Sequence, residues 1–244
     1  MQGPARTRGR AALLGLLASG VMAGLWQAAP AATIVNHPNF TSVAGLKLNG
    51  DAQHLGQAVR LTDADQESNS SVFTKRRVLR LDRSFKSVFD YYSTDAEDVA
   101  STGYAFVVHG KGKGALGGNR EGLGYAGIRP SVAVEFDFTP DQSALTGHHV
   151  AIVKNGRPNQ QPAIADFTSY GVTVHAKVVY GARRHRVSLF AAHEGEPLPE
   201  EPLVTRRLNL KRLIGERARA GFTASAYLGG STQELLSWKL TQRR

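Results

Sequence analysis

The sequence predicts an all-β fold, an antiparallel β-sandwich in a single domain. Short segments that alternate apolar and polar residues follow one another, with Gly, Asn, Asp and Pro at the breaks. A dozen or so such segments occur without the regular helices that a βαβ arrangement needs. With 244 residues and 41% hydrophobic content, the chain is long enough to bury a core. It contains no cysteine, which excludes disulfides, zinc-thiolate sites and thiol nucleophiles.

The first 31 residues have the composition of an export signal. Arg6, Arg8 and Arg10 precede an apolar run at 11–26, and small residues at 29–31 offer a cleavage point. The run is short and rich in Gly and Ala, so we expect no stable membrane span after cleavage, although a retained anchor is the alternative. We therefore expect residues 1–31 to be a signal peptide. Residues 32–244 would then form one folded domain that is secreted, periplasmic or at the cell surface.

The chain is strongly basic, with a formal net charge of +10. Its charges are scattered along the sequence and do not accompany a recognisable nucleic-acid module, so we expect no nucleic-acid partner. An anionic cell surface or polysaccharide fits this charge better, unless the charge serves only solubility. The run RRHR at 183–186 is typical of a solvated turn, with an acidic glycan as the alternative partner.

The strands can be expected in order from their alternation. Phe85, Phe89 and Tyr91 share one face of a strand, and the nearly continuous apolar run at 103–109 predicts a strand buried on both sides. The glycine-rich stretch that follows lacks a phosphate-loop pattern and predicts a tight surface loop. Only 211–219 looks helical. The expected strands lie around 46–48, 59–62, 72–74, 77–81, 84–92, 103–109, 131–138, 149–154, 170–180, 184–192, 202–210, 220–228 and 235–241.

The segment 131–156 carries the residues most relevant to function. In VAVEFDF, Glu135 and Asp137 point to one face of a strand, and Val134, Phe136 and Phe138 point to the other. Two neighbouring carboxylates repel each other unless something compensates them. A divalent cation or a proton-transfer site would do so, and so would pairing with arginines on a solvated face. Asp141, beyond Pro140, and His149 are spaced so that they can join the pair.

Five segments, in the same order, resemble the L-type (legume-type) lectin domain of the concanavalin A-like lectin and glucanase superfamily. This resemblance implies a jelly-roll β-sandwich, and we interpret the chain as a secreted bacterial member. The segments are LKLNGDAQHLGQAVRLT at 46–62, SFKSVFDYY at 84–92, STGYAFVV at 101–108, LGGNREGLGYAG before VAVEFDF, and AGFTASAYLGGSTQELLSWKLT at 220–241.

The resemblance implies a shallow saccharide site beside Ca²⁺ and a transition metal such as Mn²⁺. Oxygen ligands suit calcium, and an imidazole with carboxylates suits manganese. The residues that match the family's metal ligands are Glu135, Asp137, Thr139 through its carbonyl, Asp141 and His149. The residues expected around the saccharide are Thr102, Gly117, Gly118, Asp141, Leu228 and Gly229. We expect the backbone N–H groups near Gly118 and Gly229 to assist.

The chain also departs from the family's pattern. Thr102 stands where the family has a sugar-binding Asp, and Thr139 where it often has an aromatic residue. The loop at 142–147 contains no acid to match the second calcium Asp, which predicts a degenerate and weak metal site.

The alternatives to saccharide binding are a structural or adhesive module without sugar binding and a glucanase-type glycoside hydrolase. A retaining hydrolase needs a second carboxyl group about 5–5.5 Å from the first. Along this strand, the second carboxyl group would lie two or three positions beyond Asp137. Those positions are Thr139 and Pro140, so the acid/base partner is absent and we expect no enzymatic activity. A homodimer is a further expectation, because related lectins often pair through a sheet edge.

Overall fold

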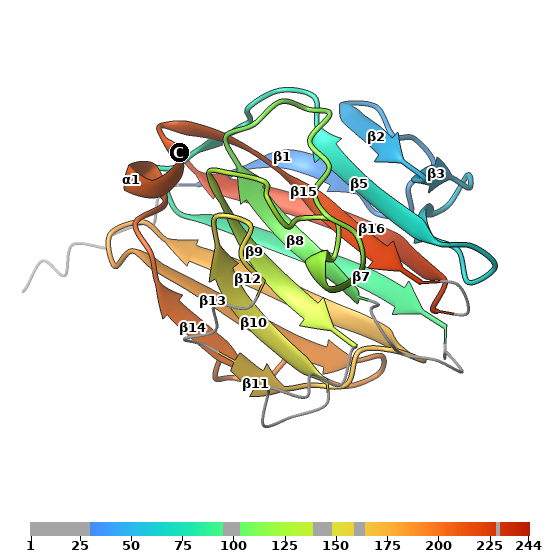
Figure 1. Cartoon of the computed structure of the whole chain (residues 1–244). Helices are drawn as coiled ribbons and strands as arrows, with labels where there is room; N and C mark the ends of the chain where they lie inside the picture. The colour runs from blue at the N-terminus through green and yellow to red at the C-terminus, as the bar shows by residue number, and fades with distance from the viewer. Residues whose placement is uncertain (1–29, 95–102, 139–147, 159–163, 228–229) are drawn as a thin grey trace, which may run out of the picture.

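Two antiparallel sheets pack face to face in the computed structural model of the chain (Figure 1). The structure describes residues 30–94, 103–138, 148–158, 164–227 and 230–244. We name the sheets after central strands, the β7 sheet and the β9 sheet. Consecutive strands often lie in different sheets, as in a jelly roll, so that the predicted all-β sandwich is confirmed.

The β7 sheet joins both ends of the described chain. Its strand β1 pairs with β16 beside the main path, from Ala31 opposite Arg243 to His37 opposite Trp238. In spatial order, the sheet contains β14 (Val204–Arg207), β13 (Arg186–His193), β12 (Thr173–Gly181), β7 (Phe85–Ser93), β16 (Gln233–Arg243), β4 (Val59–Thr62) and β3 (Gln53–His54), with β1 (Ala31–His37) on β16.

The β9 sheet carries the candidate site on its outer face. In spatial order, it contains β11 (Ile164–Asp166), β10 (His149–Lys154), β9 (Ser131–Asp137), β8 (Gly103–His109), β15 (Arg217–Ala226), β5 (Ser68–Thr74) and β2 (Leu46–Gly50), with β6 (Leu79–Arg80) on β15. Strand β8 is buried along its whole length, as its apolar run predicts.

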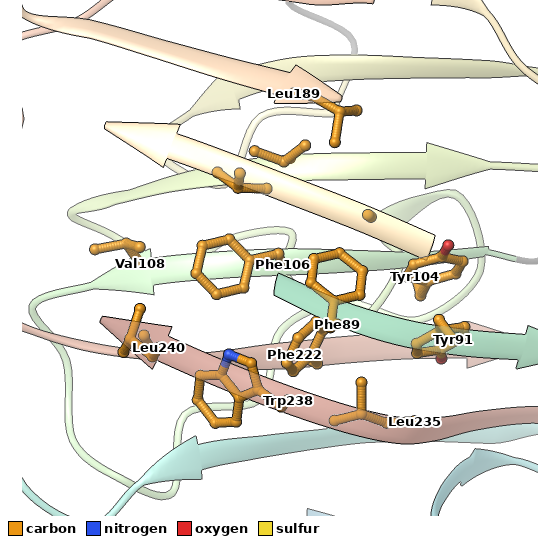
Figure 2. Packing of buried hydrophobic residues seen from close by; sticks show 14 of the residues in the cluster. Phe89, Tyr91, Tyr104, Phe106, Val108, Leu189, Phe222, Leu235, Trp238 and Leu240 are labelled. Carbon is orange, nitrogen blue, oxygen red and sulfur yellow. The ribbon is translucent and has the colours of Figure 1, made fainter. Parts of the chain in front are cut away.

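Aromatic side chains fill the space between the sheets (Figure 2). The Phe222 ring lies edge-on to Phe89, with ring centroids 4.9 Å apart, and edge-on to Trp238 at 5.2 Å. Such edge-to-face pairs add to the stabilisation that comes from area burial. The Trp238 indole N–H donates to the Ser87 hydroxyl at 2.9 Å, so the largest side chain of the core leaves no buried donor unpaired.

A second, smaller core lies on the outer face of the β9 sheet. The glycine-rich segment 110–127 and Ile128 fold back over that face. Residues 118–121 are exposed, as expected of a surface loop, whereas residues 122–125 are buried. Leu123, Tyr125 and Ile128 are all at most 1% exposed there. They pack on outward-facing side chains of the sheet, namely Phe73, Ala105, Val107, Ala133, Ala151 and Val153.

Several elements differ from the sequence-based expectation. The helix predicted over 211–219 is only the short α1 (Leu210–Ile214), because Gly215 ends it with a positive φ of 113°. Residues from Arg217 onward form β15 instead. Strand β1, which precedes the first predicted strand, was not expected, and a single-turn 3-10 helix, η1 (Arg120–Gly122), lies within the glycine-rich segment.

Candidate functional site

The candidate site begins at one end of the β9 sheet, where three strands align three residues side by side. Asp137 of β9 lies opposite Gly103 of β8 and opposite His149 of β10. Directly opposed residues share a face, and Glu135, two residues before Asp137, shares it too. The apolar neighbours Val134 and Phe136 point into the core between the sheets, so the predicted division of this strand is confirmed.

Glu135 is the most unusual residue of this group, because its carboxyl group is buried in the second core. Its exposure is 1%, and the Tyr125 hydroxyl donates a hydrogen bond to Oε2. The other oxygen, Oε1, has no hydrogen-bond partner among the described residues and lies 3.9 Å from Nε2 of His149. The alternative that this acid lies on a solvated face paired with arginines is therefore wrong for Glu135.

Burial controls the protonation of Glu135. It raises the pKa of the Glu135 carboxyl to about 8, and the nearby Asp137 carboxylate adds to the rise. The hydrogen bond from Tyr125 acts in the opposite direction with a smaller effect. Burial also raises the pKa of the Tyr125 hydroxyl well above its usual value, so this group stays protonated and remains a donor. A proton on Glu135 therefore removes much of the repulsion between the two acids at neutral pH.

The described part of the chain does not form a metal centre. No three His, Asp or Glu side chains within it lie together in a way that would hold a metal ion. Calcium takes six to eight oxygen ligands, whereas one Glu135 oxygen here is already bonded to Tyr125. Glu135 Oε1 and His149 Nε2 face each other, but two atoms do not complete a calcium or manganese site. The expected ligands Thr139 and Asp141 lie outside the described residues.

Of the six residues expected around a saccharide, Gly117 and Gly118 lie in the described part. Both lie in the segment that covers the β9 sheet, where the Gly117 N–H donates to the Gly124 carbonyl at 2.8 Å. The Gly118 N–H donates to the Ala126 carbonyl at 2.9 Å. Contrary to our expectation, it is therefore not available to a saccharide. A Cβ on Gly117 would lie 2.4 Å from the Ala126 carbonyl oxygen, which explains the glycine. The remaining four, Thr102, Asp141, Leu228 and Gly229, lie outside the described residues.

Sequence reasoning missed Tyr125, the partner of Glu135. The signal was present in LGYAGI at 123–128, where three large apolar side chains recur among glycines. A fully solvated loop does not need large apolar side chains at that spacing. It is typical of a segment that lies on a sheet and buries its larger side chains.

The comparisons with known proteins agree with this architecture. A family model described as "Legume lectin domain" matches residues 33–244. Peanut lectin, solved with a nine-residue peptide, is similar in structure with a TM-score of 0.73 and 22% identity, over 88% of this chain and 98% of that one. A lectin from Bauhinia forficata, solved in complex with GalNAc, has a TM-score of 0.72 and 18% identity, over 86% of this chain and 98% of that one. The Lotus tetragonolobus seed lectin has a TM-score of 0.74 and 17% identity, over 86% of this chain and 98% of that one.

The family match spans most of the chain and coincides with the two sheets described above. Within the described residues, no helix has the length and apolar character to cross a membrane. Members of the matched family bind carbohydrate and are not enzymes, so the expectation of no catalytic activity is confirmed and the glycosidase alternative is excluded. The chain thus belongs to the legume lectin domain family and is a carbohydrate-binding lectin.

Proposed function

We propose that the chain is an exported lectin that binds saccharide at the end of the β9 sheet where Gly103, Asp137 and His149 align. The observation that carries the proposal is the legume lectin fold with a second core that fixes the glycine-rich segment beside this end. Thr102, Asp141, Leu228 and Gly229 would line the saccharide, together with the segment around Gly117 and Gly118. Export as a domain of residues 32–244 is supported by the basic and apolar composition of residues 1–31.

The metal centre of this lectin is degenerate in our proposal. Legume lectins generally bind Ca²⁺ and Mn²⁺. Here Tyr125 donates to the carboxylate that would ligate the transition metal, and the loop 142–147 has no acid. Glu135 and His149, with Asp137, Thr139 and Asp141, would hold a cation only weakly. Saccharide binding would then depend on side-chain and backbone contacts that need no cation to order them.

A glycan array tests both parts of the proposal. The chain is applied to the array in EDTA and, in parallel, in CaCl₂ with MnCl₂. GalNAc and galactose glycans belong on the array, because a structural neighbour was solved with GalNAc. We expect binding to a restricted set of glycans that falls less than threefold in EDTA. A loss of binding in EDTA would contradict the degenerate centre, and no binding to any glycan would favour an adhesive module.

A pair of variants locates the site once a glycan is found. Asp141→Ala removes a carboxylate from the proposed saccharide site, and we expect the affinity to fall on the order of tenfold, as for loss of a hydrogen bond to a charged group. Asp65→Ala removes an exposed carboxylate from the turn between β4 and β5 and is the matched control. Equal affinities of the two variants would place the saccharide elsewhere.

A homodimer is the final part of the proposal. Sheet edges offer unpaired backbone groups to a second copy of the chain, and the β7 sheet has edges at β14 and β3, with β1 beside β16. Sedimentation equilibrium at micromolar concentration would give twice the monomer mass, and a monomer mass throughout would contradict it.

A further inference from the structure

Three basic residues that are far apart in the sequence come together around His109, on the outer face of the β9 sheet, and the charges of all three act on its ring. Arg219 lies near the start of β15, Arg77 follows β5, and Lys111 follows β8. Strands β5 and β8 flank β15 on either side, so the fold brings together charges that look scattered in the sequence. Strand β15 begins after α1, at the end of the sandwich where that helix lies (Figure 1).

This basic cluster of Arg77, Lys111 and Arg219 lies far from the proposed saccharide site. Arg219 is opposite His109, the last residue of β8, whereas Gly103, its first residue, lies at the saccharide end. Six residue steps along a strand correspond to about 20 Å. A ligand bound at the cluster would therefore not compete directly with a small saccharide.

Backbone carbonyl groups, not carboxylates, hold the two guanidinium groups in place. Arg219 donates from Nε to the Lys111 carbonyl at 3.2 Å and from a terminal nitrogen to the Thr74 carbonyl at 2.8 Å. Arg77 donates to the Gly110 carbonyl, also from a terminal nitrogen, at 2.5 Å. Each guanidinium has five N–H donors, so both keep donors for a ligand while their positions are fixed.

No carboxylate of the described residues forms an ion pair with the cluster. Burial and then the charge of Arg77 hold the pKa of Arg219 below its usual value. Burial lowers the pKa of His109 to about 4, and all three cations add to that effect. Holding like charges together is costly, and a bound anion would offset this cost.

We propose that Arg77, Lys111 and Arg219 form a second ligand site that binds the anionic groups of an acidic polysaccharide. Guanidinium groups bind carboxylate and sulfate oxygens with paired hydrogen bonds, and an ammonium adds a point charge. Arg77 and Lys111 are exposed and Arg219 is half-buried, so all three are accessible to a chain that crosses the sheet end. The site extends the lectin function from neutral sugar recognition to charged glycans.

The surroundings of the cluster favour a polysaccharide over nucleic acid or membrane. Single-stranded nucleic acid is usually held by aromatic side chains that stack on its bases, and a membrane surface by inserted apolar side chains. The exposed large hydrophobic residues of the described chain are Leu55, Leu116 and Tyr227, and none is adjacent in sequence to a member of the cluster. Carbohydrate is also the ligand class of the family to which the chain belongs.

Binding of the chain to heparin and to polygalacturonate, measured by calorimetry at several salt concentrations, tests the proposal. The double variant Arg77→Gln/Lys111→Gln removes two exposed charges with little effect on packing. We expect its affinity to fall at least tenfold, as for the loss of two charge-assisted contacts. The matched control is Lys86→Gln/Lys239→Gln, which removes two exposed charges from strands β7 and β16 of the other sheet, and we expect it to lose less than twofold.

Further outcomes keep the proposal falsifiable. Arg219→Lys keeps the charge but loses the planar fork, and we expect an intermediate loss of affinity with an unchanged melting temperature. An equal loss in both double variants would show nonspecific attraction and overturn the proposal, as would the absence of binding at low salt. Displacement by a neutral glycan that the array identifies would assign both ligands to one site, and tighter binding of a single-stranded oligonucleotide would replace the polysaccharide.

Discussion

Replacing Glu135 with Gln should change how the stability of the protein depends on pH. The wild-type carboxyl has a pKa of about 8 in the folded protein and an ordinary value of 4.5 when unfolded. Between these values the unfolded chain releases the proton first, so the free energy of unfolding falls as pH rises. The stabilisation is complete below about pH 4.5 and is lost as the pH approaches 8. Gln carries no such proton, so the variant lacks this loss.

The expected size of the effect follows from the two pKa values. Linkage gives a loss of about 3 kcal/mol for the wild type between pH 4 and pH 7, and it applies in full because Glu135 is 1% exposed. Relative to the wild type, the Glu135→Gln variant should therefore gain about 3 kcal/mol over this interval. Other groups titrate in the same range, but they contribute equally to both proteins and cancel in the difference.

Urea unfolding in EDTA, followed by tryptophan fluorescence at pH 4, 5, 6 and 7, measures this difference. Glu121→Gln is the matched control, because Glu121 is exposed in the same segment and its substitution should give a difference that does not vary with pH. A constant difference for Glu135→Gln would refute the reasoning, since it would mean that Glu135 is ionised in the folded protein. Repeating the series with CaCl₂ and MnCl₂ would flatten the trend if a cation binds this carboxylate.

Two further substitutions test the packing of the sheets. Trp238→Ala empties the centre of the core and breaks the bond to Ser87, so we expect a loss of about 3–5 kcal/mol in urea unfolding, and a loss under 1 kcal/mol would contradict the described packing. Gly221→Ala places a Cβ 1.9 Å from the Val72 carbonyl oxygen and should prevent the pairing of β15 with β5, which circular dichroism and melting would detect. Gly112→Ala, where a Cβ has open space, should melt within about 2 °C of the wild type.

Alternation along the strands made most of the fold predictable. The division of Glu135 and Asp137 from Val134 and Phe136 follows from the period of two, and the burial of β8 follows from its apolar run. Helix α1 was predicted too long because its basic residues suit a helix, whereas Gly215 and pairing with neighbouring strands decide the outcome. Strand β1 was missed because its pairing with β16 is a contact between the two ends of the described chain, which local pattern does not show.

The environment of the candidate site was less predictable than its position. The sequence places Glu135 and His149 on strands that can meet, and the structure brings them to 3.9 Å. The sequence does not show that Tyr125 reaches Glu135, because the glycine-rich segment is held over the sheet by side-chain packing and by hydrogen bonds to distant strands. The cluster of Arg77, Lys111 and Arg219 was missed for a similar reason, since only the order β8, β15, β5 in the sheet brings these residues together.

The glycine-rich segment is bonded to itself as well as to the sheet. Backbone hydrogen bonds join Gly117, Gly118 and Gly124 to one another and to Ala126. The side chains of Leu123 and Tyr125 pack on the sheet and fix the segment there. A glycan that meets this rim would find it already ordered, so association would sacrifice little conformational entropy there. Evolution could then exchange the outward side chains of such a platform and alter its sugar preference without disturbing the scaffold underneath.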